Sequence, residues 1–256
     1  MHCLKNINEK VLIERSNYGK IMRACLILIL IPILVLGYAN ASKITVGPQN
    51  ADYSQIQQAI DNSSQGDIIE VQSGVYRENV HVYKTLTLQG IDSGKGLPVV
   101  DAGGSGSVIS ITSNGTIVEG FNITGSGGCG CGNAGIKVGS SNNIVQSNII
   151  YKNKYGIYIP SGNENNTFLS NDLLDNEITV SDSGINNRWN GSVPAGGLKG
   201  LMELISGPRV LGNHYSDYDE EKEGCIDANQ DKICDKSKEI GSGTGKDNYP
   251  SATSMN

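Results

Sequence analysis

Three short segments share one pattern: TIVEGF at 116–121, NIVQSN at 143–148 and NTFLSN at 166–171. The second and third copies are 23 residues apart, and the first and second are 27 apart because the glycine-rich segment 125–132 adds length. Each copy offers only a short strand, which cannot bury its own apolar face. A repeat of this length therefore predicts a solenoid, in which successive coils stack and pair their backbones.

In such a stack, equivalent positions of successive coils lie one above the other. Asn148 and Asn171 occupy equivalent positions, so we expect their side chains to bond in a ladder. Leucine-rich repeats have a similar period, but they need Leu at fixed offsets, where this chain has Ile, Val and Asn. Upstream of the repeat, further short β segments alternate with glycine turns between residues 44 and 104.

One short helix is predicted before these strands, over Tyr53–Ile60. Apolar Ile56, Ala59 and Ile60 have the spacing of one helical face, and Asp52 is a suitable N-cap residue.

The segment 52–90, with GDIIEV, SGVYRENV and TLTLQG, and the units NNIVQSNII and NNTFLSNDL resemble a known superfamily. It is the right-handed parallel β-helix superfamily of carbohydrate-binding and sugar-hydrolase proteins, and the likeness is to its NosD-type periplasmic and cell-surface branch. The match runs from about Lys43 to Asn190. The tail pieces GNHYSDY (212–218), DANQDKICD (227–235) and DNYP (247–250) also look like tail motifs of that branch.

The resemblance implies an all-β, right-handed parallel β-helix of about six or seven coils, each about 4.8 Å deep. It also implies a helix capping the N-terminal end and an irregular C-terminal tail. It implies no single function, because this fold carries lyases, hydrolases, epimerases, adhesins and maturation factors.

Residues 1–41 are predicted to be a secretory signal peptide or an N-terminal anchor. Lys20 and Arg23 precede an apolar run over 24–37, and Ala39-Asn40-Ala41 offers a cleavage site. The run is about 14 residues long, whereas a membrane span needs roughly 20. Met22 is an alternative start. We therefore expect a secreted, periplasmic or cell-surface protein, in contact with a membrane only if this segment stays uncleaved.

The predicted domains are the β-helix at 42–190 and a C-terminal capping segment with an acidic tail at 191–256. Leu198, Leu201 and Leu204 favour a short amphipathic helix within 196–211 that would cover the open end of the column. Trp189, the one Trp of the sequence, follows the last clear repeat and is expected to close the column there.

Composition fits a narrow column and excludes one class of partner. The chain has 33 Gly, only 5% aromatic residues and a net charge of −6. Nucleic-acid binding needs clustered Lys and Arg, so we expect no nucleic-acid partner. Five sequons are candidate glycosylation sites in an exported chain; they begin at Asn62, Asn114, Asn122, Asn165 and Asn190.

A candidate calcium loop lies in the acidic tail. Oxygen ligands recur at positions 1, 3, 5, 7 and 9 of a tight loop, where hard oxygens can surround Ca²⁺; these are Asp227, Asn229, Asp231, the Ile233 carbonyl and Asp235. Lys232 at position 6 and Lys238 at position 12 depart from the EF-hand pattern, so the predicted role is structural. Cys225 and Cys234 flank the loop, and a disulfide between them would close it. The alternative is a solvated acidic turn.

Cys129 and Cys131 are separated by one glycine. Two thiolates at this spacing suit a soft metal such as Cu(I), and the NosD branch is associated with copper delivery to nitrous oxide reductase. Outside the predicted signal segment only His81 and His214 remain, and no Met-rich or His-rich cluster accompanies the pair. The alternative is a loop disulfide, either between these two cysteines or to another cysteine.

Enzyme activity is the other alternative, as a polysaccharide lyase or glycoside hydrolase. A hydrolase needs two facing carboxylates, yet Glu119 faces Gln146 and then Leu169 in the aligned repeats. We recognise no catalytic residues. Tyr151, Tyr155 and Tyr158 are candidates for stacking on sugars, although strand alternation would place Tyr155 and Tyr158 on opposite faces. The alternative is that they are edge tyrosines that cover an end of the column.

The sequence therefore predicts an exported or cell-surface β-helix module that is non-catalytic. It would bind a cell-surface glycan or surface protein through residues that the sequence does not identify, and it would carry a structural calcium tail.

Overall fold

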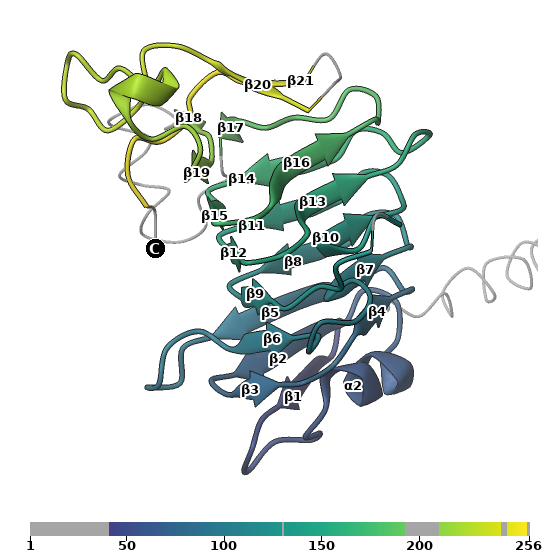
Figure 1. Cartoon of the computed structure of the whole chain (residues 1–256). Coiled ribbons are helices and arrows are strands. Elements are labelled where there is room, and N and C mark those ends of the chain that lie inside the picture. Colours follow the sequence, from purple (N-terminus) through teal and green to yellow (C-terminus); the bar gives the residue numbers. More distant parts are fainter. Residues whose placement is uncertain (1–40, 130, 193–209, 242–244, 255–256) are drawn as a thin grey trace, which may run out of the picture. The chain divides into compact units, whose positions relative to one another are not determined.

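The computed structural model describes residues 41–129, 131–192, 210–241 and 245–254. Almost all of the predicted signal segment lies outside this part of the chain. Most strands form three parallel sheets that share one column (Figure 1). No helix of the described residues is long and apolar enough to span a membrane.

Each sheet takes one strand from every coil. Sheet A contains β1 (Lys43–Val46), β2 (Ile68–Gln72), β5 (Thr87–Ile91), β8 (Ile117–Glu119), β11 (Ile144–Gln146) and β14 (Thr167–Leu169). Sheet B contains β3 (Val75–Tyr76), β6 (Val99–Asp101), β9 (Asn122–Thr124), β12 (Ile149–Tyr151), β15 (Asp172–Leu174) and β19 (His214–Tyr215). Sheet C contains β4 (Val80–Val82), β7 (Ile109–Ile111), β10 (Ala134–Val138), β13 (Tyr155–Ile159) and β16 (Ile178–Asp182).

The chain passes through sheets A, B and C in turn, which makes it the predicted right-handed parallel β-helix. Five coils, from β2–β4 to β14–β16, are complete among the described residues, and β1 and β19 add partial coils at the ends. About six or seven were expected. The aligned repeats pair as predicted: Val118, Val145 and Phe168 are register partners and are fully buried.

The core is one narrow column of aliphatic side chains that point inward from alternate strand positions. Burying one Val, Leu or Ile contributes about 1.5–3 kcal/mol. Successive inward positions in sheet A show the stacking, and all are fully buried: Ile69, Leu88, Val118 and Val145. A chain with few aromatic residues can therefore still form a continuous core.

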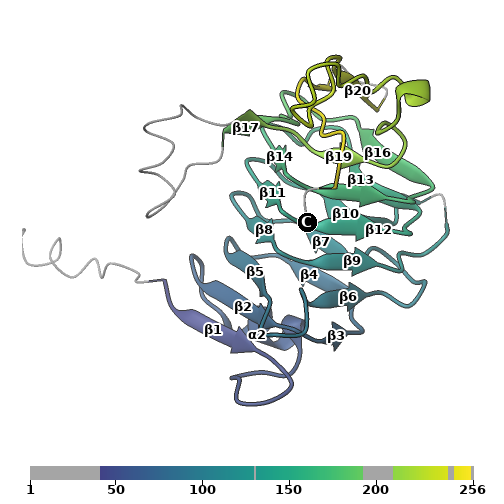
Figure 2. The ribbon, with the colours of Figure 1, turned by 90° about the vertical axis from the view of Figure 1, so that its left-hand side faces the viewer.

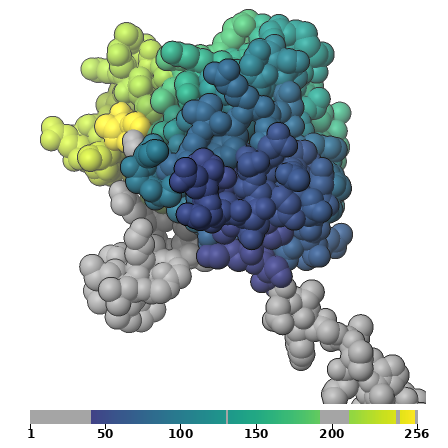
Figure 3. Space-filling model, turned by 90° about the horizontal axis from the view of Figure 1, so that it is seen from below, coloured from purple at the N-terminus to yellow at the C-terminus, as the bar shows by residue number. Residues whose placement is uncertain are grey.

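The N-terminal end of the column carries the helix α2 (Ile56–Asn62). It begins three residues after the predicted Tyr53, and the predicted N-cap is wrong. The Asp52 carboxylate instead accepts bonds from the Thr45 amide (2.8 Å) and hydroxyl (2.7 Å). Glu78 caps the helix, because its two oxygens accept from the amides of Ile56 (3.0 Å) and Gln57 (2.9 Å). Seen from below, closely packed N-terminal residues cover this end (Figure 3).

At the other end, Trp189 is fully buried and stacks on Phe168 of the last coil, with ring centroids 4.2 Å apart. It covers the column as expected. The predicted helix at 196–211 lies mostly outside the described residues. Its last two residues are not helical, since β18 (Val210–Leu211) pairs antiparallel with β17 (Gly191–Ser192).

The tail lies over the C-terminal end of the column (Figure 2). It contains the 3-10 turn Glu221–Glu223 and an antiparallel pair, β20 (Lys238–Ile240) and β21 (Gly245–Asp247). The tail strand β19 pairs in parallel with β15 and so continues sheet B, with Asp172 opposite His214.

Candidate functional site

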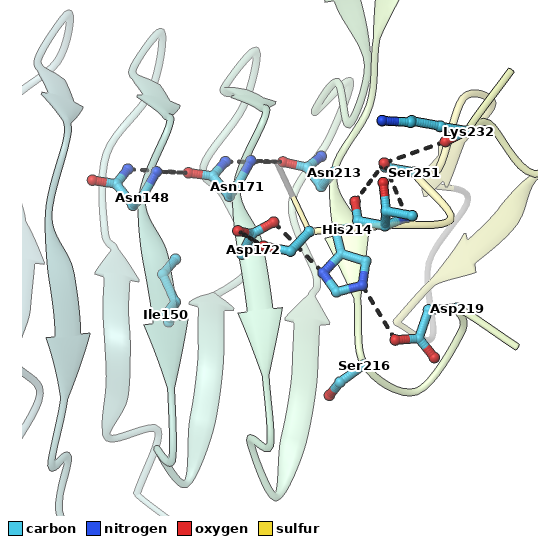
Figure 4. Close-up of polar contacts among 12 residues, drawn as sticks. Asn148, Ile150, Asn171, Asp172, Asn213, His214, Ser216, Asp219, Lys232 and Ser251 are labelled. Carbon is cyan, nitrogen blue, oxygen red and sulfur yellow. Dashed lines mark hydrogen bonds and ion pairs between the residues drawn. The ribbon is translucent and has the colours of Figure 1, made fainter. Parts of the chain in front are cut away.

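Asparagine side chains form ladders at the corners of the column. Asn148 Nδ2 donates to Asn171 Oδ1 (3.0 Å), which confirms the predicted stacking, and Asn171 Nδ2 donates to Asn213 Oδ1 (2.9 Å) (Figure 4). Two further ladders run at other corners, through Asn143, Asn166 and Asn187 and through Asn153 and Asn176. They satisfy turn amides that the coils would otherwise bury unpaired.

Asp247 ends the ladder that passes through Asn213. Its Oδ2 accepts bonds from the Asn213 amide (2.7 Å) and the Tyr215 hydroxyl (3.0 Å), and its Oδ1 accepts from the Tyr249 amide (3.0 Å). The carboxyl is fully buried, and this burial raises its pKa to about 6 against the lowering effect of those bonds. Gly212 permits the close approach, because a Cβ there would lie 2.2 Å from Asp247 Oδ1. Two sequence motifs of the tail, GNHYSDY and DNYP, thus meet at one point.

His214 lies beside this point, between two carboxylates (Figure 4). Its Nδ1 is 3.5 Å from Asp172 Oδ1 and its Nε2 is 3.2 Å from Asp219 Oδ2, and the side chain is only 6% exposed. Burial alone would lower the pKa of His214, but Asp172 and Asp219 outweigh it and raise that pKa. At 3.5 Å the Nδ1 contact is an ion-pair contact rather than a good hydrogen bond.

The surroundings of His214 favour a structural role. Asp172 is fully buried and also accepts a hydrogen bond from Ser254 Oγ (2.6 Å), so it holds both ends of the tail. Both ring nitrogens of His214 face carboxylates on opposite sides. The imidazole is therefore not open to a substrate, and it ties the tail to the last coil.

The predicted calcium loop is closed by the predicted Cys225–Cys234 disulfide. Its side-chain oxygens turn inward onto the loop's own amides: the Asp231 amide donates to Asp227 (3.1 Å) and to Asn229 (3.0 Å). Asp235 accepts from the Ala228 amide (3.0 Å). Across the described residues, no group of three or more His, Cys, Asp or Glu is arranged to hold a metal. The calcium site stays a prediction.

Cys129 and Cys131 are joined as a disulfide, the alternative to a copper-binding pair. Asn133 Nδ2 donates to Cys129 Sγ (2.9 Å). Next to the pair, Gly132 lies against Tyr158, since a Cβ on Gly132 would be 2.6 Å from the ring. Both sulfurs are oxidised here, so copper binding would require that they first be reduced.

Tyr155 and Tyr158 lie together on the outside of sheet C, with ring centroids 5.3 Å apart. The expectation that they face opposite sides is wrong. Between them Gly156 and Ile157 are both buried, so strict alternation fails just after the corner at Asn153. The Lys137 ammonium lies 5.7 Å from the centre of the Tyr158 ring. This cluster of Lys137, Tyr155 and Tyr158 is called the tyrosine face below.

The outside of sheet A carries a polar column instead. Glu119 accepts hydrogen bonds from Gln89 Nε2 (2.7 Å) and Gln146 Nε2 (2.5 Å), its register partners in the neighbouring coils. Its immediate neighbours in this column are amides and not a second carboxylate, so Glu119 has no facing acid with which to cleave a glycosidic bond.

The five sequons fall in two groups. Asn62, Asn114 and Asn165 are exposed. Asn122 and Asn190 are half-buried, and their amide nitrogens donate to the carbonyls of Leu97 (3.4 Å) and Lys246 (3.3 Å). Glycosylation stays a prediction, and exposure favours the first group.

Comparison with known proteins places the chain among exported proteins. A family model described as "Periplasmic copper-binding protein (NosD)" matches residues 31–220. A cell surface glycoprotein of Methanothermus fervidus is 38% identical over 103 residues, which are 39% of this chain and 17% of that protein. The chain therefore spans well under two thirds of the length of this curated relative.

Among solved structures, pectin methylesterase from carrot covers 60% of this chain and 55% of its own, with 14% identity and a TM-score of 0.36. Pectin methylesterase from Aspergillus niger covers 59% of this chain and 58% of its own, with 17% identity and a TM-score of 0.35. Likeness at this level says nothing about activity.

Proposed function

The chain belongs to the NosD family, and we propose that it acts as a non-catalytic β-helix module that binds carbohydrate or another component of the cell surface. It is an exported or cell-surface protein. The tyrosine face is the observation that carries carbohydrate binding. Aromatic rings present broad apolar surfaces with a polar edge, and such surfaces suit the apolar faces of sugar rings.

Two further contacts support a non-catalytic role. Glu119 is bonded on both sides by glutamine amides, and His214 is buried between carboxylates. Neither group is free to act as an acid or base on a bound sugar.

Isothermal titration with a panel of cell-surface oligosaccharides tests the proposal. A double variant, Tyr155→Ala with Tyr158→Ala, should weaken binding at least about tenfold, equivalent to about 1.4 kcal/mol. Tyr83→Ala removes an exposed tyrosine outside the tyrosine face and serves as the matched control. Unchanged affinity of the double variant would contradict the proposal. Turnover of any glycan, with or without Ca²⁺, would instead favour the lyase or hydrolase alternative.

Copper delivery is the second candidate function, and the family's description as copper-binding supports it. A thiol reductant would transfer two electrons and two protons to the Cys129–Cys131 disulfide and yield two thiols. These thiols would lose their protons on binding Cu(I), a soft metal. After reduction and Cu(I) loading, metal analysis should find copper in the native protein and none in a Cys129→Ser/Cys131→Ser variant. Equal copper in both would contradict this function.

We also propose that the Asp227–Asp235 loop holds a structural Ca²⁺. A ligand that binds only the folded state raises its stability. EDTA should therefore lower the melting temperature of the native protein. In Asp231→Ala the melting temperature should be the same with and without EDTA. Asp175→Ala, at a turn of the column, is the control variant. No EDTA effect on the native protein would contradict a bound calcium ion.

A further inference from the structure

A groove of about 330 Å³ lies between the last strand of sheet C, β16, and the tail strand β20. Glu177, Ile178 and Thr179 line it from the column. Asp217, Lys238 and Glu239 line it from the tail. Its volume is at the lower end of the range of small-molecule sites.

The groove adjoins the tyrosine face. Ile178 is the register partner of Tyr155 in the neighbouring coil, about 4.8 Å further along the column. Register partners in a parallel sheet project to the same side, and Ile178 is 37% exposed, unusually high for a large apolar residue here. The tyrosine face therefore adjoins the groove through Ile178.

Every charged side chain that lines the groove already has an opposite charge as partner. Glu177 pairs with Lys154, Asp217 with Lys238 (3.0 Å) and Glu239 with Lys246 (2.6 Å). The Asp217 carboxylate also accepts a bond from Thr179 Oγ1 (2.8 Å). An ionic ligand would have to compete with these pairs, whereas hydroxyl groups can add hydrogen bonds to the carboxylates without breaking them.

The groove is also held in shape before any ligand arrives. Lys238 is only 14% exposed and lies over the rings of Tyr215 (5.1 Å) and Tyr218 (5.0 Å). Its pairing with Asp217 fixes both side chains at the groove wall. Fixed polar groups lose little conformational entropy on binding, which favours recognition of a weakly bound neutral ligand.

We propose that this groove extends the tyrosine face into a site for a neutral oligosaccharide whose chain runs along the column, from Tyr155 and Tyr158 to Ile178. The proposal rests on the carbohydrate binding proposed above and deepens it. One sugar ring would stack on the tyrosines, and later rings would contact Ile178 and place hydroxyls against the paired carboxylates.

A length series of neutral oligosaccharides, titrated into the full chain, tests the groove. Affinity should rise with chain length in the native protein. Ile178→Asp should weaken the longer oligosaccharides about tenfold and leave the shortest one unchanged. The Tyr155→Ala/Tyr158→Ala variant should weaken all of them. Ile185→Asp, at a more exposed isoleucine outside the groove, is the control, and thermal melts confirm that each variant is folded.

Each other outcome overturns a distinct claim. If Ile178→Asp binds long oligosaccharides as tightly as the native protein, the groove proposal fails while the tyrosine face stands. If oligosaccharides of uronic acids bind as tightly as neutral ones of equal length, the neutral ligand class is wrong. If the native protein binds no glycan, the carbohydrate binding proposed above fails and this inference fails with it.

Discussion

Asn171 shows what one residue contributes to a corner of the column. Its side chain makes four hydrogen bonds: Oδ1 accepts from the Asn148 amide and side chain, and Nδ2 donates to the Val145 carbonyl and to Asn213. The residue is fully buried, so no water can replace these partners.

Asn171→Ala should therefore lower the free energy of unfolding by about 2–4 kcal/mol, because it leaves buried donors and acceptors unpaired. Asn62→Ala, at an exposed position of α2, should change it by less than about 0.5 kcal/mol. Urea titration followed by circular dichroism measures both. Similar values for the two variants would show that the ladder does not stabilise the column.

Asp247 and His214 make the attachment of the tail depend on pH. The folded pKa of Asp247 is raised from 3.8 to about 6. Its contribution to the stability of the folded state is therefore complete below pH 3.8 and is lost as pH rises through 6. The folded pKa of His214 is raised above 6.5. Its contribution to the stability of the folded state is therefore present below pH 6.5 and is lost as pH rises through the raised pKa. Both groups should weaken the tail's attachment as the solution becomes more alkaline.

Melting temperatures measured from pH 4 to 8 check this prediction. The difference in melting temperature between the native protein and Asp247→Asn should vary mainly between pH 4 and 6. The corresponding difference for His214→Gln should vary mainly above pH 6.5. Differences that stay constant over the whole range would contradict the proposed protonation states.

The sequence predicts one half of this ladder and misses the other. Asn148 and Asn171 follow the 23-residue repeat, so alignment alone pairs them. Asn213 is 42 residues beyond Asn171, because segment 193–209 interrupts the period, and Asp247 lies a further 34 residues on. Contacts between motifs separated in this way leave no periodic signal.

At the scale of elements, local rules predict the kind of element better than its boundaries and faces. Asp52 has the residue type and position of an N-cap, but Glu78, 22 residues beyond Ile56, caps α2 instead. Strand alternation likewise fails at β13, where the buried pair Gly156 and Ile157 brings Tyr155 and Tyr158 to one side. Both exceptions arise from packing between coils, which local spacing does not contain.

Gly156 is the residue on which the tyrosine face depends. A Cβ there would lie 2.5 Å from the Thr179 carbonyl of the next coil, so Gly156→Ala must push β13 and β16 apart. We expect it to cost about 1–3 kcal/mol of stability and to weaken glycan binding. Gly128→Ala is the matched control, because a Cβ at that position would have no atom within 4 Å. Equal stability and binding for the two alanine variants, measured by melts and titration, would contradict this account.

At the scale of the whole described column, we expect each coil to open with its own free energy. Each coil contacts only its neighbours, so the free energy of opening is set by nearby interfaces and not by the chain as a whole. The tail meets the column at the last coil, through β15 paired with β19 and through Trp189 beneath Gly245. The repeat in the sequence predicts the architecture of the column. The tail that covers the end of the column has no repeat, so the sequence does not predict how the tail attaches.

Loosening the tail should therefore expose one end of the column and spare the other. In Asp247→Ala, the partners of the buried carboxylate, Asn213 and Tyr215, lose their anchor. Hydrogen exchange followed by mass spectrometry should show faster exchange in β15 and β16 and unchanged exchange in β2 and β5, which lie at the far end of the sheets. Asp61→Ala, on the exposed side of α2, is the control and should leave β15 and β16 protected. If Asp247→Ala accelerated exchange equally in all coils, the column would unfold as one cooperative unit, and the nearest-neighbour description of this solenoid would be wrong.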